Sequence, residues 1–251
     1  MNLKTKLASK EVSCGSWITL ANPGIAEIMA RAGFDWLVVD LEHSVITIRE
    51  AEELIRVIEL NGVCPLVRLS SNNEVQIKRV MDAGARGVVV PMVNSRKEAE
   101  NAVASVYYPP LGRRGVGLAR AQGYGTDFEE YKTWLEKEAV LIVQVEHIQA
   151  VENLESILSV DQVDGFMVGP YDLSASLGIP GQFENPLFLN AMEKIKEIGI
   201  HSAKSPGIHV VEPDINAFQE KIDQGYRFMA YSLDIRMLDT SCRKALKAFH
   251  G

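Results

Sequence analysis

Two groups of oxygen-bearing side chains follow neighbouring apolar runs of this sequence. Gln144 and Glu146 come at the end of one run, and Asp172 follows the next. Residues two apart on a strand face the same side, so Gln144 and Glu146 share a face, and Asp172 arrives from the next strand at the same end of the sheet. Oxygen ligands suit a hard cation, so we expect Glu146 and Asp172 to bind one divalent metal ion such as Mg²⁺ or Mn²⁺.

Elements that position these residues can be read from the alternation of β-branched runs with amphipathic segments. The runs predict eight strands, at Cys14–Leu20, Trp36–Asp40, Pro65–Leu69, Gly87–Pro91, Val140–Val145, Gly165–Val168, Gly207–Val211 and Phe228–Ser232. The segments between most of them predict helices at Gly24–Ala32, Ile48–Asn61, Glu74–Ala83, Arg96–Val106, Phe128–Lys137, Leu187–Ile198 and Pro213–Gln224, and a final helix is expected at Ser241–His250.

Strands that are apolar nearly throughout are typical of a parallel sheet covered by helices on both faces. Eight strand–helix units in a chain of 251 residues predict an α/β fold, a closed (β/α)₈ barrel. A doubly wound sheet is the alternative, and against it no GxGxxG follows the first strand. The final helix packs either on its own barrel or on a neighbouring subunit.

Composition narrows the class of protein. With 47% hydrophobic residues and no linker-like stretch, residues 1–251 are expected to form one domain. The net charge of −7 comes with no basic stripe, which argues against nucleic acid and anionic membranes and favours a small-molecule ligand. The first ten residues contain no continuous apolar run and no run approaches ~20 residues, so we expect neither a signal peptide nor a membrane span. Three cysteines without CxxC spacing suit a reducing cytoplasm.

Other polar residues end the predicted strands of this barrel. Asp40 and His43 follow the second strand, and Arg68 ends the third. Any one of them could be a satisfied structural group. Their convergence with the carboxylates at the carboxyl ends of the strands indicates catalysis, because chemistry in this fold occurs at that end.

Several polar residues are expected to lie outside the site. Asp82 falls at a helix end on the opposite rim, from which it would reach an active site only across a subunit boundary. Alternate residues of a strand face opposite sides, so Glu42 would face away from His43, and His147 would face away from Gln144 and Glu146. His209 could point into the barrel, but a buried structural histidine is the better expectation.

The connection from Val93 to Glu138 is much longer than the other connections between predicted strands. After a helix it contains three arginines, Arg113, Arg114 and Arg120, among tyrosines and glycines. Connections of this length are usually functional or disordered. We expect an ordered lid that contacts anions over the barrel mouth; a solvated surface insertion is the alternative.

Taken together, these residues resemble the HpcH/HpaI aldolase family, which are metal-dependent class II pyruvate aldolases of the phosphoenolpyruvate/pyruvate barrel superfamily. The resemblance runs essentially end to end. Its landmarks are Gly15–Trp17, Ala32–Ser44, Pro65–Arg68, Asp82–Pro91, Tyr108–Gly115, Gln144–Glu146 and Val168–Gly178. Tyr171 stands where a smaller residue is common, which bears on the breadth of substrates.

The resemblance implies roles for these residues. Glu146 and Asp172 would bind Mg²⁺, Mn²⁺ or Co²⁺, and Arg68 would hold the keto or enolate oxygen of pyruvate. His43 would handle protons together with Asp40 and with Asp82 of an adjacent subunit. The residues expected to contact substrate are Trp17, Arg68, Arg114, Gln144, Gly169, Pro170, Tyr171 and Ser174. The resemblance also implies a homo-hexamer or trimer with an exchanged C-terminal helix.

Chemistry argued from the residues agrees with this reading. A 4-hydroxy-2-oxo acid would be cleaved to pyruvate and an aldehyde through a pyruvate enolate that the metal and Arg68 stabilise. A Schiff-base mechanism needs a lysine in the barrel, and none lies in the predicted strands or at their ends. An oxaloacetate decarboxylase or acyl-CoA lyase with the same enolate is the nearest alternative, and a non-catalytic keto-acid-binding barrel is the more distant one. The aldehyde, the metal and the base stay open.

Overall fold

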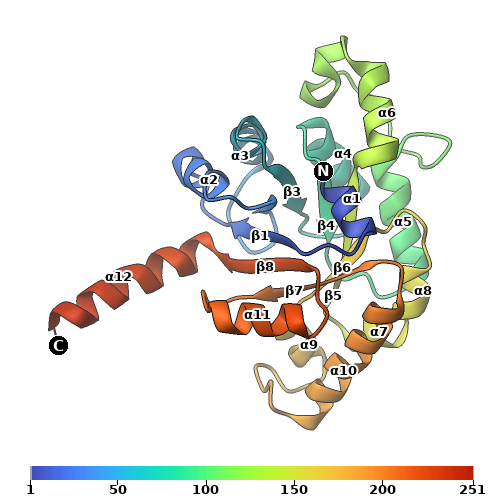
Figure 1. The fold of residues 1–251 in the computed structure, drawn as a ribbon. Helices are drawn as coiled ribbons and strands as arrows, with labels where there is room; N and C mark the ends of the chain where they lie inside the picture. Colours follow the sequence, from blue (N-terminus) through green and yellow to red (C-terminus); the bar gives the residue numbers. More distant parts are fainter. Residues whose placement is uncertain (1, 251) are drawn as a thin grey trace.

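Eight parallel strands close into a barrel at the centre of the molecule (Figure 1). The computed structural model describes residues 2–250. The strands are paired in chain order, and β8 pairs with β1. Their bounds are β1 Ser13–Ile18, β2 Trp36–Asp40, β3 Cys64–Arg68, β4 Gly87–Val90, β5 Val140–Val145, β6 Gly165–Val168, β7 Ser205–Val210 and β8 Phe228–Leu233. The predicted (β/α)₈ barrel is confirmed, and the doubly wound alternative is excluded.

Helices connect the strands and surround the barrel (Figure 1). No helix in the described part of the chain is both long and apolar enough to span a membrane. The helices are α1 Leu3–Ala8, α2 Pro23–Ala30, α3 Ile48–Leu60, α4 Glu74–Asp82, α5 Arg96–Val106, the 3₁₀-helix η1 Arg120–Gly125, α6 Phe128–Glu138, α7 Ile148–Glu152, α8 Leu154–Leu158, α9 Pro170–Ser176, α10 Pro186–His201, α11 Ile215–Asp223 and α12 Asp234–His250.

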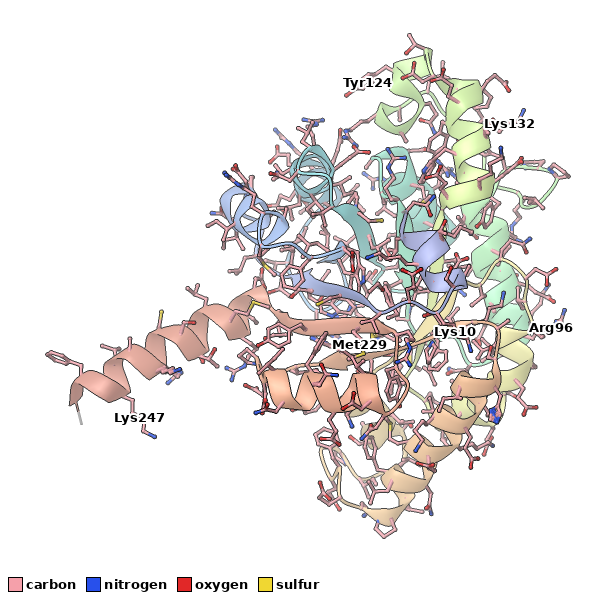
Figure 2. All side chains as sticks on the ribbon, in the orientation of Figure 1. Lys10, Arg96, Tyr124, Lys132, Met229 and Lys247 are labelled. Carbon is pink, nitrogen blue, oxygen red and sulfur yellow. The ribbon has the colours of Figure 1, made fainter. Side chains whose placement is uncertain are left out.

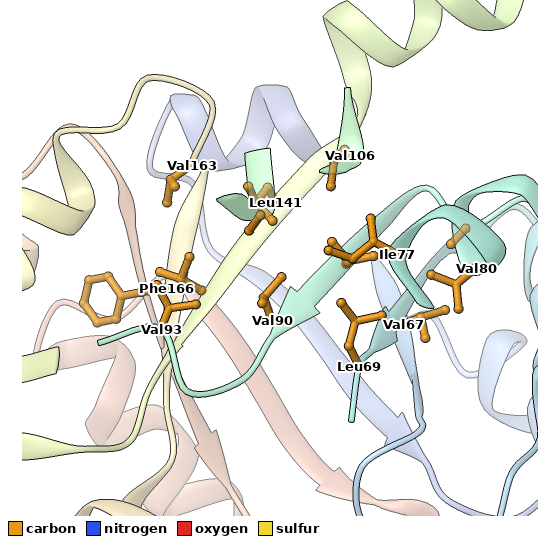
Figure 3. Packing of buried hydrophobic residues seen from close by; sticks show 14 of the residues in the cluster. Val67, Leu69, Ile77, Val80, Val90, Val93, Val106, Leu141, Val163 and Phe166 are labelled. Carbon is orange, nitrogen blue, oxygen red and sulfur yellow. The ribbon is translucent and has the colours of Figure 1, made fainter. Parts of the chain in front are cut away.

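The hydrophobic core has an outer and an inner layer, because alternate strand residues face opposite sides. Outward residues pack against the surrounding helices: Val67 lies near Ile77 and Val80, and Leu141 lies near Val106 (Figure 3). Inward residues fill the barrel itself, where Trp36 stacks on Phe228 with ring centroids 4.2 Å apart. The two layers together bury both faces of the barrel strands.

Helix α1, which the sequence analysis did not predict, belongs to the inner layer. Leu3 and Leu7 are buried against inward residues of the barrel. Lys4 fastens the helix through an Nζ donor 2.7 Å from the carbonyl oxygen of Ala139 and 3.0 Å from the Asp164 carboxylate. Because Ala139 precedes β5 and Asp164 precedes β6, α1 closes the barrel at the amino ends of its strands.

The C-terminal helix begins earlier than expected, at Asp234 instead of Ser241. The buried Asp234 carboxylate accepts hydrogen bonds from the backbone amides of Ile235, Thr19 and Leu20, all at 2.8 Å. These bonds start α12 directly after β8 and tie it to the end of β1. The rest of α12 projects away from the barrel, and Lys247 stands near its far end (Figures 1 and 2).

Candidate active site

A cavity of about 400 Å³ lies at the carboxyl ends of the strands. Parallel strands deliver the residues that follow them to one rim, which is why segments far apart in sequence meet here. Of the residues predicted for the site, those that line the cavity are Trp17, Asp40, His43, Arg68, Gln144, Gly169, Pro170, Tyr171 and Asp172.

Arg68 is held rigidly on one side of this cavity. Its Nε and Nη2 lie 2.9 and 2.6 Å from the two carboxylate oxygens of the buried Asp40. Its guanidinium also lies 4.4 Å from the ring centre of Trp17. Burial alone would raise the pKa of Asp40, but the hydrogen bonds and charge of Arg68 hold that pKa below its usual value. The pair is therefore charged at neutral pH, and the guanidinium is fixed in orientation.

Glu42, which was expected to lie outside the site, is not among the residues that line the cavity but lies beside this pair. Its Oε2 is 3.3 Å from Arg68 Nη1 and 3.8 Å from His43 Nε2, and it is buried without a hydrogen-bond partner. Burial raises the pKa of Glu42 to about 7, and the carboxylates of Asp40 and Asp172 add to the shift. Alternation with His43 was a poor guide because β2 ends at Asp40 and the chain bends after it.

Gln144 lines the cavity, whereas Glu146, which was also predicted for the site, lies beside Gln144 and is not among the lining residues. Both side chains are buried. Glu146 Oε1 accepts a hydrogen bond from the backbone amide of Met92 at 2.7 Å, and Oε2 accepts one from Gln144 Nε2. Gln144 Oε1 is buried without a partner. A Cβ on Gly169 would lie 2.9 Å from Glu146 Oε2, so glycine is what lets β6 approach this carboxylate.

Electrostatics link Glu146 to Asp172, which lies in the first turn of α9. Burial raises the pKa of Glu146 to about 7, and the negative charges of Glu42 and Asp172 contribute. Two carboxylates that repel each other, next to the unpaired Gln144 oxygen, fit a divalent cation with oxygen ligands. Within residues 2–250 no three His, Cys, Asp or Glu side chains gather in metal-binding geometry. The fit therefore rests on two carboxylates and leaves room for substrate oxygens.

His209 also lines the cavity, although it was expected to be a structural residue. On β7 it shares parity with Gly207, and its ring lies 5.4 Å from that of Trp17. Nε2 is 2.9 Å from the carbonyl oxygen of Ser232. Burial lowers the pKa of His209 to about 4, so the ring is neutral at pH 7. Strand parity was the signal in the sequence that could have identified this residue.

Two predicted contacts on α9 differ in exposure. Tyr171 is 58% exposed at the cavity rim, with its ring edge-on to that of Phe183 at 5.0 Å. Ser174 is buried and does not line the cavity. Its hydroxyl donates to the carbonyl oxygen of Tyr171 at 2.7 Å and accepts from the amide of Gly181 at 2.9 Å. Ser174 therefore holds the α9 turn together, and its hydroxyl is already satisfied.

Arg114 and Asp82 are paired with each other away from the cavity. Arg114 is buried, and its Nη2 lies 2.7 Å from Asp82 Oδ1 and 2.9 Å from the Tyr131 hydroxyl. Asp82 also accepts from Gln122 Nε2 at 3.1 Å. Since Asp82 ends α4, just ahead of β4, this pair lies on the opposite rim, as was expected for Asp82.

The long connection does not cover its own barrel mouth, so the lid expectation is wrong for a single chain. Arg120 donates to the carbonyl oxygen of Ala83 at 3.1 Å and pairs with Glu59. Both partners lie at helix ends that precede β3 and β4, and Tyr124 lies beside α6 (Figure 2). The segment is ordered by these contacts at the amino ends of the strands.

Comparison with known proteins agrees with this geometry. The model of the HpcH/HpaI aldolase/citrate lyase family matches residues 13–240. The chain is 39% identical over 238 residues to the hydroxypyruvate/pyruvate aldolase of Roseobacter denitrificans, covering 94% of this chain and 91% of that protein. It is 35% identical to the 5-keto-4-deoxy-D-glucarate aldolase of Escherichia coli, with 98% and 95% covered. An HpcH/HpaI aldolase/citrate lyase family protein from Burkholderia cenocepacia superposes with a TM-score of 0.94 at 32% identity, with 99% of both chains covered.

Proposed function

Because the chain belongs to the HpcH/HpaI aldolase/citrate lyase family and is a carbon–carbon lyase, we propose that it reversibly cleaves a 4-hydroxy-2-oxo acid to pyruvate and an aldehyde, in a reaction that depends on a divalent metal. The observation that carries this proposal is the cavity lined by Arg68, Gln144 and Asp172, with Glu146 hydrogen-bonded to Gln144 beside it. The printed names of the aldolase relatives support the substrate class.

Glu146 and Asp172 are the residues that would hold the cation, and Mg²⁺, Mn²⁺ and Co²⁺ all suit oxygen ligands of this kind. When bound, the cation would polarise the keto group and make a C3 proton of pyruvate removable. The unpaired Gln144 Oε1 and the raised pKa of Glu146 support this assignment, since both groups would gain a partner.

Arg68 would stabilise the negative charge that develops on the keto oxygen during cleavage. Asp40 uses its Nε and Nη2, and the guanidinium carries further N–H donors. Its orientation is set before substrate arrives, so no reorganisation is needed as charge develops. No lysine is among the described residues that line the cavity, which disfavours a Schiff base.

His43 is the residue best placed to take the proton of the C4 hydroxyl. Its side chain is 61% exposed at the cavity, with Nε2 3.8 Å from Glu42. An exposed imidazole exchanges its proton readily with water, as a base that must turn over requires. The Asp40 carboxylate accepts a hydrogen bond from the backbone amide of His43 at 3.3 Å and so positions the turn that carries His43.

Proton exchange tests the proposal without knowledge of the aldehyde. Pyruvate in D₂O should lose its C3 proton signals in NMR spectra when metal-loaded protein is added, and the loss should stop after EDTA treatment and resume with Mg²⁺ or Mn²⁺. An intact, metal-loaded protein that leaves the C3 signals unchanged would contradict the enolate chemistry. Release of CO₂ from oxaloacetate in place of aldol cleavage would favour the decarboxylase alternative.

We further propose that the protein is a homo-oligomer, a hexamer or a trimer, in which α12 packs on another copy. Ile235, Leu238, Cys242 and Leu246 recur at helical spacing along α12, and all four are exposed in the single chain. A helix that projects with an apolar stripe buries it by contacting a partner. Sedimentation of the purified protein as a monomer would contradict this proposal.

A further inference from the structure

His209 offers the cavity a hydrogen-bond acceptor that the proposed reaction does not use. We propose that His209 is a specificity residue that selects substrates carrying an additional hydroxyl group, which donates to its Nδ1. The ligand class is therefore a hydroxylated 2-oxo acid, or a 2-oxo acid formed with a hydroxyaldehyde. This inference rests on the proposed function and names the substrate class within it.

The hydrogen bond to Ser232 determines the tautomer of His209. A carbonyl oxygen only accepts, so the 2.9 Å contact with the Ser232 carbonyl requires the proton on Nε2. Ser232 is itself fixed, because its hydroxyl donates to the carbonyl oxygen of Val211 at 3.0 Å. With the ring neutral, Nδ1 carries a lone pair, and no described residue donates to it.

The walls around His209 leave a substrate hydroxyl few other partners. Val211, Leu233 and Ile235 are the apolar neighbours on this side of the cavity. Thr19 also lines it, and because its hydroxyl donates to the Asp234 carboxylate at 2.6 Å, it can offer a substrate only its oxygen as a second acceptor. A hydroxyl placed here without an acceptor would lose its hydration uncompensated, whereas a substrate without that hydroxyl would leave Nδ1 unpaired.

Trp17 lies next to both His209 and Arg68, the residue that we propose binds the reacting keto oxygen. Its ring lies 4.4 Å from the Arg68 guanidinium and 5.4 Å from the His209 ring. Arg68 presents donors, which suit a keto or carboxylate oxygen, and His209 presents an acceptor, which suits a hydroxyl. A substrate that spans Trp17 can satisfy both, and pyruvate with a simple alkyl aldehyde satisfies only the first.

His209→Leu keeps an apolar side chain of similar size and removes the acceptor, while His209→Asn places an amide oxygen near the position of Nδ1. Two pairs of substrates identify the source of the hydroxyl. The first compares hydroxypyruvate with pyruvate as the 2-oxo acid, and the second compares glycolaldehyde with acetaldehyde as the aldehyde that reacts with pyruvate. In at least one pair, His209→Leu should lower the kcat/KM ratio of hydroxylated to unhydroxylated compound about tenfold, and His209→Asn should recover much of it.

His201→Leu is the matched control, since His201 is exposed at the end of α10; it should leave both ratios unchanged. Both ratios staying within about twofold of wild type in a folded His209→Leu protein would overturn the proposal. Calorimetric binding of hydroxypyruvate and pyruvate to metal-loaded protein gives the corresponding ratio of affinities for the first pair, without turnover. Absence of proton exchange would therefore count against the aldolase reaction, while the binding ratio would still decide the role of His209.

Discussion

Glu146→Gln should weaken the binding of Mn²⁺ by more than about 100-fold, because loss of an outer-shell partner alone typically costs 10- to 100-fold and Glu146 is proposed as a direct ligand. Proton exchange from pyruvate should fall with it. Gln144→Leu, which removes the unpaired Oε1, should give a smaller loss of affinity. Titration of Mn²⁺ by calorimetry measures both variants, and Glu152→Gln, an exposed carboxyl on α7, is the control.

The thermal stability of the metal-free protein provides a second test of the role of Glu146. Burial raises the pKa of Glu146 from 4.5 to about 7, so the folded protein holds this proton more tightly than the unfolded chain does. The contribution of Glu146 to stability is therefore lost as the pH rises from about 4.5 through about 7. Above pH 7 the metal-free Glu146→Gln protein should unfold at a higher temperature than wild type, and added Mn²⁺ should reverse that order. Equal Mn²⁺ affinities in variant and wild type would rule Glu146 out as a ligand.

Much of this site can be predicted from the alternation of side-chain direction along a strand, which applies only as far as the strand extends. Gln144 and Glu146 share a face as predicted, and Glu146 keeps its phase one residue past β5 because the Met92 amide holds its carboxylate. Beyond β2 parity gives no guidance: the Asp40 carboxylate accepts hydrogen bonds from the amides of Glu42 and His43, and the chain bends. The side chain of His43 lines the cavity, and that of Glu42 pairs with Arg68 beside it. Residues that follow a strand end need the turn geometry, which residue spacing does not contain.

Tertiary contacts decided the features that the sequence analysis missed or misplaced. Arginines in a long connection fit an anion-binding lid as well as they fit buried ion pairs, and only the position of Asp82 on the opposite rim shows that Arg114 lies away from the cavity of its own chain. Helix α1 is six residues long and is held by Leu3 and Leu7 inside the barrel end, so helical periodicity alone could not reveal it. The fold was predictable because eight repeated units carry the same pattern, whereas each of these features occurs once.

Arg68→Ala should lower kcat for pyruvate proton exchange by about 10²–10³-fold, the loss that typically follows removal of one donor to a developing oxyanion. The reason is that Arg68 is fixed by Asp40 and Trp17 before substrate binds, so its donors cost no reorganisation. Arg68→Lys keeps the charge but not the planar fork that pairs with both oxygens of Asp40, and most of the loss should remain. Initial rates of deuterium incorporation measure all three proteins.

A structural explanation for that loss can be separated from a catalytic one. Arg68→Ala leaves the buried Asp40 carboxylate without its positively charged partner, which should destabilise the fold. Asp40→Asn combined with Arg68→Ala removes the uncompensated charge, so the double variant should regain thermal stability without regaining rate. Arg56→Ala, on the exposed face of α3, should change neither. Recovery of the exchange rate together with stability in the double variant would mean that Arg68 serves the fold and not the reaction.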